Sequence, residues 1–153
     1  MKLITEDLLN EVSAQAQQNS RLRMNYNFHE SMEASLHRML NALEPGTYLP
    51  PHRHKDPDKE EIYLVLRGSL LAVFFDEQGN MTEKVSLNPA KGSYGIEIPA
   101  RAWHSIIVLE KGTVIHEIKQ GPFAPLTPEN IAPWAPDSSD IGACIKYMNQ
   151  FCD

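Results

Sequence analysis

The sequence has few cysteines, no long apolar run and no excess of basic residues, and each shortage excludes a class of protein. Its two cysteines, Cys144 and Cys152, lie outside any CxxC or zinc-finger spacing, so we expect reduced thiols that serve packing. Acidic residues at Glu6 and Asp7 interrupt the N-terminal segment, and no run reaches the about 18 apolar residues that a membrane-spanning helix requires. These absences predict a cytoplasmic chain with no membrane span.

The net charge weighs against nucleic acid as a partner. With a formal charge of −6, the chain lacks the excess of Lys and Arg from which phosphate-backbone binding draws its affinity. Hydrophobic residues make up 42% and charged residues 22% of the 153 residues, which is the composition of a globular chain with a length suited to one domain. We therefore expect a single domain that folds alone or as a small oligomer.

The hydrophobic periodicity changes once along the chain. Apolar residues recur at helical spacing from Thr5 to about Gln18, which predicts one amphipathic helix, and residues 19–33 lose this period and are expected to form an extended connector. Beyond residue 34, short apolar runs alternate with Gly and Pro turn signals, which predicts eight strands without intervening helices. The expected strands are 35–43, 47–54, 61–67, 69–76, 82–87, 93–98, 103–109 and 113–119. The predicted fold class is therefore all-β, as a small antiparallel sandwich or barrel.

Prolines concentrate near the C-terminus. Five of the eleven lie between Gly121 and Pro136, and because proline donates no ladder hydrogen bond, we expect this segment to wrap the barrel surface. Its Phe123 and Trp134 are expected to cover an open sheet edge, with a pocket mouth as the less favoured position. Apolar residues then recur every three to four positions over 141–152, which predicts a short closing helix. The single domain thus comprises an N-terminal helix and connector (1–33), a β-barrel (34–120) and a wrapping segment with a short helix (121–153).

One stretch of the sequence places metal-ligand residue types around a bend. His52 and His54 lie two apart, so on a strand both imidazoles project from the same face. The polar loop that follows is broken by a proline, and the chain returns as a strand that opens with Glu61. His104, which follows Pro99 at the start of a later strand, supplies a third imidazole. Divalent transition metals favour imidazole nitrogens with a carboxylate, so we predict a metal site formed by these three histidines and Glu61.

These residues also fall in the frame of a known superfamily. The first cupin motif consists of Gly, five residues, His, any residue, His, three or four residues, Glu, six residues and Gly. Gly46, His52, His54, Glu61 and Gly68 match this frame, except that six residues separate the second histidine from the glutamate. The sequence therefore resembles the cupin superfamily, and the resemblance implies an RmlC-like jelly-roll barrel with an N-terminal helix and a short C-terminal helix.

The departures from the cupin pattern leave alternatives open. The longer gap allows Glu60 to replace Glu61 as the carboxylate ligand, although the six-residue spacing to the following glycine favours Glu61. In the second cupin motif, Pro99 and His104 keep their usual separation, but Arg101 replaces the usual glycine. The first motif is specific and the second is partial.

At a finer level, the sequence resembles the WbuC family of cupin-fold metalloproteins. The resemblance is carried by the stretch from Met39 to Gly79, by the segment IPARAWHS and by the proline-rich segment. Members are associated with O-antigen and lipopolysaccharide gene clusters in bacteria, so the resemblance implies a link to surface polysaccharide. It also implies one divalent transition metal ion (Fe, Mn, Ni or Zn) in the mouth of the barrel. By analogy with barrels of this kind, we expect a homodimer.

Five further residues are candidates for catalysis or substrate binding. A general base is required for catalysis, and Glu60, Tyr63 and Glu117 are the candidates, although a tyrosine in a barrel wall more often serves packing. Arg101 lies on the bend before the third histidine, where a guanidinium can hold a carboxylate or phosphate, and a solvent-exposed arginine is equally expected there. Lys119 shares one strand face with Glu117 and would contact a substrate if that face is internal.

The predicted ligand set leaves two open positions on an octahedral metal, which suits the binding of a small-molecule substrate. The favoured hypothesis is a metal-dependent enzyme that acts on a sugar or sugar nucleotide in bacterial lipopolysaccharide or O-antigen metabolism, by isomerisation, epimerisation, elimination or hydrolysis. The alternatives are a non-catalytic binding or regulatory cupin for a carbohydrate or small acid, and an iron-dependent dioxygenase. In a third hypothesis the metal only stabilises the barrel.

Overall fold

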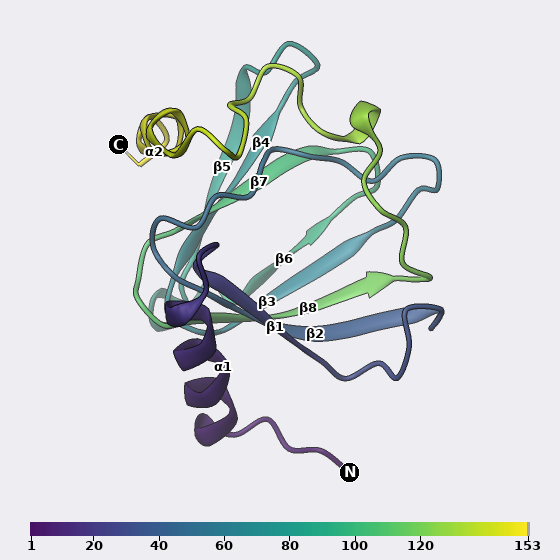
Figure 1. Ribbon diagram of the computed structural model, residues 1–153, viewed down its shortest axis with the longest axis vertical. Coiled ribbons are helices and arrows are strands. Elements are labelled where there is room, and N and C mark those ends of the chain that lie inside the picture. The colour runs from purple at the N-terminus through teal and green to yellow at the C-terminus, as the bar shows by residue number, and fades with distance from the viewer. Residues whose placement is uncertain (153) are drawn as a thin grey trace.

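Eight strands form two antiparallel sheets that face each other, with one α-helix near each end of the chain (Figure 1). The computed structural model describes residues 1–152. The elements are α1 (Glu6–Gln18), β1 (Arg23–Asn27), β2 (Leu36–Leu43), β3 (Glu61–Arg67), β4 (Leu70–Phe75), β5 (Met81–Leu87), β6 (Gly95–Ile98), β7 (Trp103–Val108), β8 (Thr113–Gln120) and α2 (Ile141–Asn149), with short 3-10 helices η1 (Pro89–Lys91) and η2 (Pro128–Asn130). The order is β1-β2-β8-β3-β6 in the larger sheet and β5-β4-β7 in the smaller.

The alternation of side chains along the strands explains the layers. On β4, Leu70 and Phe74 point into the space between the sheets, whereas Leu71, Val73 and Phe75 lie on the opposite face. The inner face packs against apolar residues of the larger sheet, and the outer face packs against α2 and the C-terminal segment. The result is the all-β jelly roll that was predicted, in an open two-sheet form without a closed barrel.

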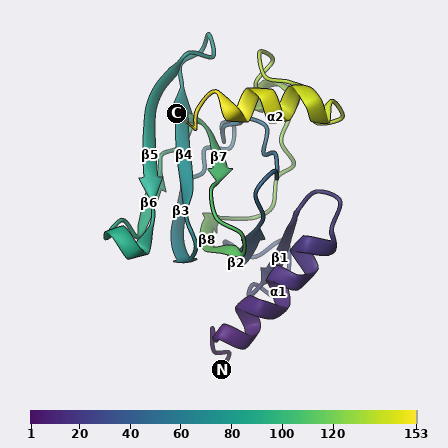
Figure 2. The same cartoon turned by 90° about the vertical axis from the view of Figure 1, so that its left-hand side faces the viewer.

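The helix α1 covers the outer face of the larger sheet. Its buried residues Leu9, Val12 and Ala16 lie on one side of the helix and pack with Leu40 of β2 and Val114 of β8. The helices α1 and α2 lie towards opposite ends of the molecule (Figure 2). Within residues 1–152, neither helix has the length and apolar content that a membrane crossing requires.

Two local predictions were wrong. Residues 19–33 are more than a connector, because Arg23–Asn27 form β1, which pairs with β2. Residues 47–54 form no regular strand, because Pro50 and Pro51 lack the N–H groups that a ladder needs. Only His52 from this stretch takes part in isolated bridges. The other seven predicted strands are present with ends that shift by at most two residues.

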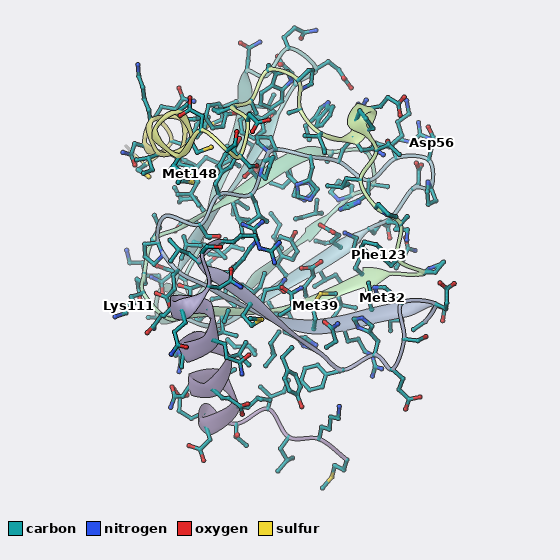
Figure 3. All side chains as sticks on the ribbon, in the orientation of Figure 1. Met32, Met39, Asp56, Lys111, Phe123 and Met148 are labelled. Atoms are coloured by element: carbon teal, nitrogen blue, oxygen red, sulfur yellow. The ribbon has the colours of Figure 1, made fainter. Side chains whose placement is uncertain are left out.

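The proline-rich segment runs from the end of β8 along one side of the molecule to α2 (Figure 1). Trp134 packs against Phe75 and Trp103 on the outer face of the smaller sheet, at ring-centroid distances of 5.0 and 6.1 Å. Phe123 instead lines a cavity, which is the position that the sequence favoured less. This side of the molecule also carries Met32 and Met39, which line the same cavity (Figure 3).

Candidate metal centre

The structure brings the three histidines and Glu61 together between the two sheets. His52 and His54 lie in the loop before β3, Glu61 is the first residue of β3 in the larger sheet, and His104 lies on β7 in the smaller sheet. One ligand atom from each residue lies within 4.8 Å of the others. The four residues are only 1% to 9% exposed. Residues more than fifty positions apart in sequence therefore converge on one buried point.

Backbone hydrogen bonds fix the histidine loop onto the sheet. The N–H of His52 donates to the carbonyl of His104 at 3.0 Å, and the N–H of His104 donates back at 2.9 Å. The carbonyl of His54 accepts from the N–H of Arg101 at 3.1 Å. This double pairing replaces the strand that was expected here and holds the rings of His52 and His104 with centroids 4.4 Å apart.

The hydrogen bonds of two imidazoles select the tautomer that binds metals. Nδ1 of His52 lies 3.0 Å from the carbonyl oxygen of Pro50, and Nδ1 of His104 lies 3.0 Å from that of Ala102. A carbonyl only accepts, so each Nδ1 carries a proton, and Nε2 is the atom that a neutral ring leaves free to bind a metal. Burial, followed by the neighbouring His104, lowers the pKa of His52 to about 3, so this imidazole is neutral at pH 7. Neutral imidazoles held by a carbonyl are the donors that a divalent metal requires.

Glu61 supplies the charge of the group. Its Oε1 lies 2.8 Å from Nε2 of His54 and 2.5 Å from Nζ of Lys119, and its Oε2 lies 3.2 Å from Nε2 of His104. Burial alone would raise the pKa of Glu61, but the imidazoles of His104 and His54 and the Lys119 ammonium outweigh burial and hold it well below its usual value. Three nitrogen donors and one ionised carboxylate thus fit a divalent transition metal, and Oε1 of Glu61 and Nε2 of His104 have no hydrogen bond of good geometry within residues 1–152.

The remaining predicted site residues separate into two groups. Tyr63 and Glu117 lie opposite each other on β3 and β8, and the Tyr63 hydroxyl donates to Oε2 of Glu61 at 2.9 Å. Glu60, the alternative ligand, is exposed and lies outside the group. Arg101 is also exposed, and its guanidinium is directed to Asp58 at 2.7 Å rather than to the metal group. The structure therefore brings Tyr63 and Glu117 to the centre and leaves Glu60 and Arg101 outside it.

Glu117 is the acid whose pKa lies nearest to neutral pH. Burial raises its pKa to about 7, and the charge of Glu61 adds to this effect, whereas Lys119 and a hydrogen bond from Asn41 oppose it. Burial, with the charge of Glu61, raises the pKa of Tyr63 well above 10, so its phenol stays protonated and serves as a donor. Of these two candidates, only Glu117 exchanges a proton readily at neutral pH.

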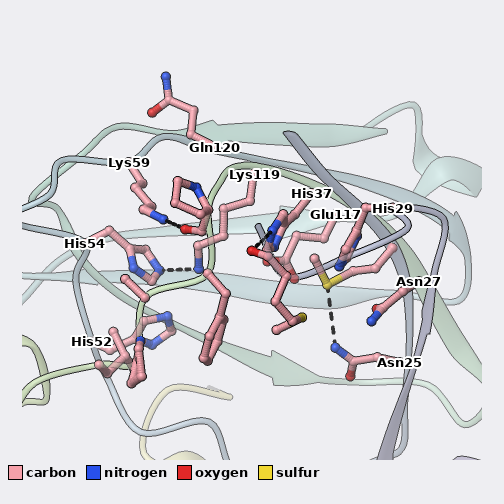
Figure 4. Close-up of a pocket in the computed structure, with 17 residues that line it drawn as sticks. Asn25, Asn27, His29, His37, His52, His54, Lys59, Glu117, Lys119 and Gln120 are labelled. Carbon is pink, nitrogen blue, oxygen red and sulfur yellow. Dashed lines mark hydrogen bonds between the residues drawn. The ribbon is translucent and has the colours of Figure 1, made fainter. Parts of the chain in front are cut away.

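A cavity of about 460 Å³ opens beside the metal group. It extends from His52 and His54 past Lys119 and Glu117 (Figure 4), and its lining also includes Phe123. A second cavity of about 160 Å³ borders Glu61 from the other side and also includes Glu117 and Lys119. Glu117 and Lys119 therefore face space on both sides, as expected of residues that would meet a ligand.

Sequence reasoning missed two polar residues of the larger cavity. Asn25 and Asn27 line it from β1, the strand that was predicted as a connector. The signal was present in the sequence, because Met24, Tyr26 and Phe28 alternate with them and pack with the α1 cluster. A period of two therefore marked this strand and put both asparagines on the face opposite the helix.

A family described as a domain of unknown function (DUF6016) matches residues 4–87, more than half of the 153-residue chain. The chain belongs to this family. The matched part of this DUF6016 chain includes His52, His54 and Glu61, and His104 lies beyond it. No curated protein is significantly similar to the DUF6016 chain.

Solved structures resemble the DUF6016 chain in fold. KdgF from Halomonas sp. is 17% identical, with a TM-score of 0.52 over 67% of this chain and 82% of that one. The capsular polysaccharide assembling protein CapF from Staphylococcus aureus is 19% identical, with a TM-score of 0.52 over 70% of this chain and 29% of CapF. Oxalate decarboxylase is 22% identical, with a TM-score of 0.51 over 67% of this chain and 26% of that one. The structural neighbours are cupin-superfamily proteins, so the likeness shows the cupin jelly-roll fold.

Proposed function

We propose that this chain is a metal-dependent enzyme that acts on a sugar or sugar nucleotide. The metal ligands are His52, His54, Glu61 and His104, and Glu117 is the general acid–base. The observation that carries the proposal is that Glu117, with a pKa of about 7, lines the same cavity as two of the metal-binding histidines. A buried carboxyl that titrates near neutral pH beside a Lewis-acid site is the arrangement that proton transfer requires.

The bound metal supplies Lewis acidity and open coordination positions, whichever of Fe, Mn, Ni or Zn it is. The side chains around the metal site transfer the proton and orient the reacting groups. Glu117 takes a proton from a substrate carbon or hydroxyl and returns it, and the hydrogen bond from Asn41 orients its carboxyl. The Tyr63 phenol orients Glu61 through a hydrogen bond and does not act as a base. Isomerisation, epimerisation, elimination and hydrolysis all need this one movable proton.

The biological setting extends the same proposal. The resemblance to the WbuC family and the structural likeness to a capsular polysaccharide assembling protein both support a substrate from bacterial surface polysaccharide, in lipopolysaccharide or O-antigen metabolism. Such a sugar or sugar nucleotide is made in the cytoplasm, where we place this enzyme. The proposal is independent of which sugar is used, because the proton transfer step is common to all of them.

A homodimer is part of the proposal, and the outer face of β3 supports it. Ile62, Leu64 and Leu66 project from this face and are 37% to 39% exposed. An antiparallel sheet that leaves one face to water normally has polar residues on that face, so an outward apolar row is unusual. A second copy of the chain would bury the outward row and remove an apolar surface from water.

Hydrogen–deuterium exchange at substrate carbons tests the proposed chemistry. Metal-loaded protein is incubated in D2O with a panel of nucleotide sugars and lipopolysaccharide sugars, and deuterium incorporation or product formation is followed by mass spectrometry. We expect one class to react, and we expect Glu117→Gln to slow the reaction at least about 100-fold with unchanged metal content. Glu60→Gln is the matched control, because Glu60 is exposed and lies outside the site.

The outcomes separate the alternatives. Equal loss in the two variants, or none in Glu117→Gln, would contradict the assignment of the base. Tight binding of a sugar or small acid with no reaction would support the binding or regulatory cupin instead. Oxygen uptake by the Fe(II)-loaded protein would support the dioxygenase, and a metal that only raises the melting temperature would support the structural role.

A further inference from the structure

Lys59 is a buried lysine without an acidic partner. The residue is 5% exposed, and its ammonium donates to the backbone carbonyl of Pro122. In residues 1–152, no carboxylate lies within the 4.0 Å ion-pair distance of this ammonium. The adjacent acids are engaged elsewhere, since Asp58 binds Arg101 at 2.7 Å and Glu60 is exposed. Lysines are almost never buried without a partner, because removing an unpaired charge from water is costly.

The unpaired charge faces the ligand cavity. Lys59 and Lys119 both line the cavity of about 460 Å³, on the side of His54 (Figure 4). The two lysines differ in one respect, because Lys119 lies 2.5 Å from Glu61 and is neutralised by it. The cavity wall therefore keeps one uncompensated positive charge.

The surroundings of Lys59 indicate which chemical groups its ligand can carry. An ammonium has three N–H donors, and the carbonyl of Pro122 takes one of them. His52 and His54 of the metal group border the same cavity, so one ligand can reach both Lys59 and the metal group. The lining of the cavity also includes Phe123 and Met39, which offer apolar contact to a sugar ring.

We infer that the ligand of this cavity carries an anionic group, a carboxylate or a phosphate, and that Lys59 binds this group. The inference rests on the proposed function for the cavity as the place where substrate binds. It narrows the substrate to sugar acids and to sugars with a phosphate, nucleotide sugars included. A neutral sugar would leave the ammonium of Lys59 buried and unpaired, whereas an anion forms charge-assisted hydrogen bonds to it. Lys59 is thus a specificity-determining residue.

Equilibrium binding with matched sugar pairs tests the inference. The probes are galacturonate against galactose and glucose 6-phosphate against glucose, titrated into the full chain by calorimetry, with added Mn²⁺ and with chelator. We expect at least one charged sugar to bind at least about tenfold tighter than its neutral twin, and the pair that shows this tells carboxylate from phosphate.

Variants assign the preference to Lys59. We expect Lys59→Gln to reduce the charged sugar's advantage by about 10-fold to 100-fold and Lys59→Arg to retain most of it. The matched control is Lys111→Gln, since Lys111 is exposed and lies far from Phe123 and the cavity (Figure 3). Circular dichroism checks the fold of each variant, and the comparison of the twin sugars on the wild-type chain needs no variant.

Equal affinity of the wild-type chain for both members of each pair would overturn the inference, as would a preference that survives Lys59→Gln. These results are distinct from a failure of the proposed function, because binding is measured without turnover. Charged sugars that bind through Lys59 but do not react would leave this inference standing and refute the enzyme. A neutral sugar that reacts equally well with the wild-type chain and with Lys59→Gln would support the enzyme and overturn the inference about Lys59.

Discussion

Glu117 should make the stability of the metal-free protein depend on pH. Its pKa is raised from an ordinary 4.5 to about 7, mainly by burial, so between these values the folded state holds a proton that the unfolded state has lost. The free energy of unfolding therefore falls as the pH rises from about 4.5 to 7 and levels off above 7. Since each pKa unit corresponds to about 1.4 kcal/mol, ionised Glu117 lowers stability by about 3 kcal/mol at pH 8.

The substitution Glu117→Gln removes this titration and keeps the shape. The glutamine side-chain carbonyl can still accept the hydrogen bond that Asn41 donates to Glu117. Between pH 5 and pH 8, we expect the free energy of unfolding in urea to fall by about 2.5 kcal/mol more for the chelator-treated wild-type chain than for the chelator-treated variant. The contributions of all other groups are common to both proteins and cancel in the difference.

Glu97→Gln provides the control, because Glu97 is exposed on β6. Its pH profile should run parallel to that of the wild-type chain. If the profile of Glu117→Gln were also parallel, the carboxyl of Glu117 would be ionised throughout the range. It would then be too weak a base for the role that we propose.

Three further predictions follow from the same geometry. Replacing His52 and His54 together by alanine should abolish binding of metal, measured by elemental analysis. Chelator should lower the melting temperature of the metal-loaded wild-type chain by about 5 to 10 °C and should leave the melting temperature of this variant unchanged. Leu64→Asp, on the outward face of β3, should convert the proposed dimer to a monomer in light scattering without altering metal content, and a wild-type monomer would contradict the proposed interface. Gly68→Ala should cost about 3 kcal/mol in urea unfolding, because Gly68 has φ +80° and a Cβ there would lie 2.8 Å from the Cα of Thr113; a loss below 1 kcal/mol would show that the turn adapts.

The ligand residues could be predicted because their spacing is a local property of the chain. His52, His54 and Glu61 lie within ten positions, and His104 follows a proline at the start of a strand, so residue type and position were enough to group them. The details of the loop were not predictable in this way. The expected strand through His52 failed because consecutive prolines removed its donors, and the pairing with His104 replaced it.

The anion-binding side of the cavity could not be predicted, because it depends on long-range contacts. Lys59 lies in a charged loop, where a lysine is ordinarily solvated, but it is buried, and its ammonium donates to the carbonyl of Pro122, 63 positions away. Arg101 shows the opposite case. The sequence placed it on the bend beside His104, but Asp56 and Asp58 of the neighbouring loop draw its guanidinium outward. Which of two basic residues faces a ligand is decided by packing that no local pattern records.

Charge balance relates metal binding at the ligand residues to anion binding at the lysines of the cavity wall. Glu61 and Glu117 together carry two negative charges when both are ionised, which one divalent cation neutralises. Lys59 and Lys119 then remain as two positive charges on the wall of the same cavity. A carboxylate neutralises one of these charges, and a phosphate dianion neutralises both. Lys119 lies 2.5 Å from Glu61, and a cation held by the ligand residues would compete for this carboxylate and leave the ammonium available to an anion. Binding of the metal and binding of an anionic sugar should therefore favour each other.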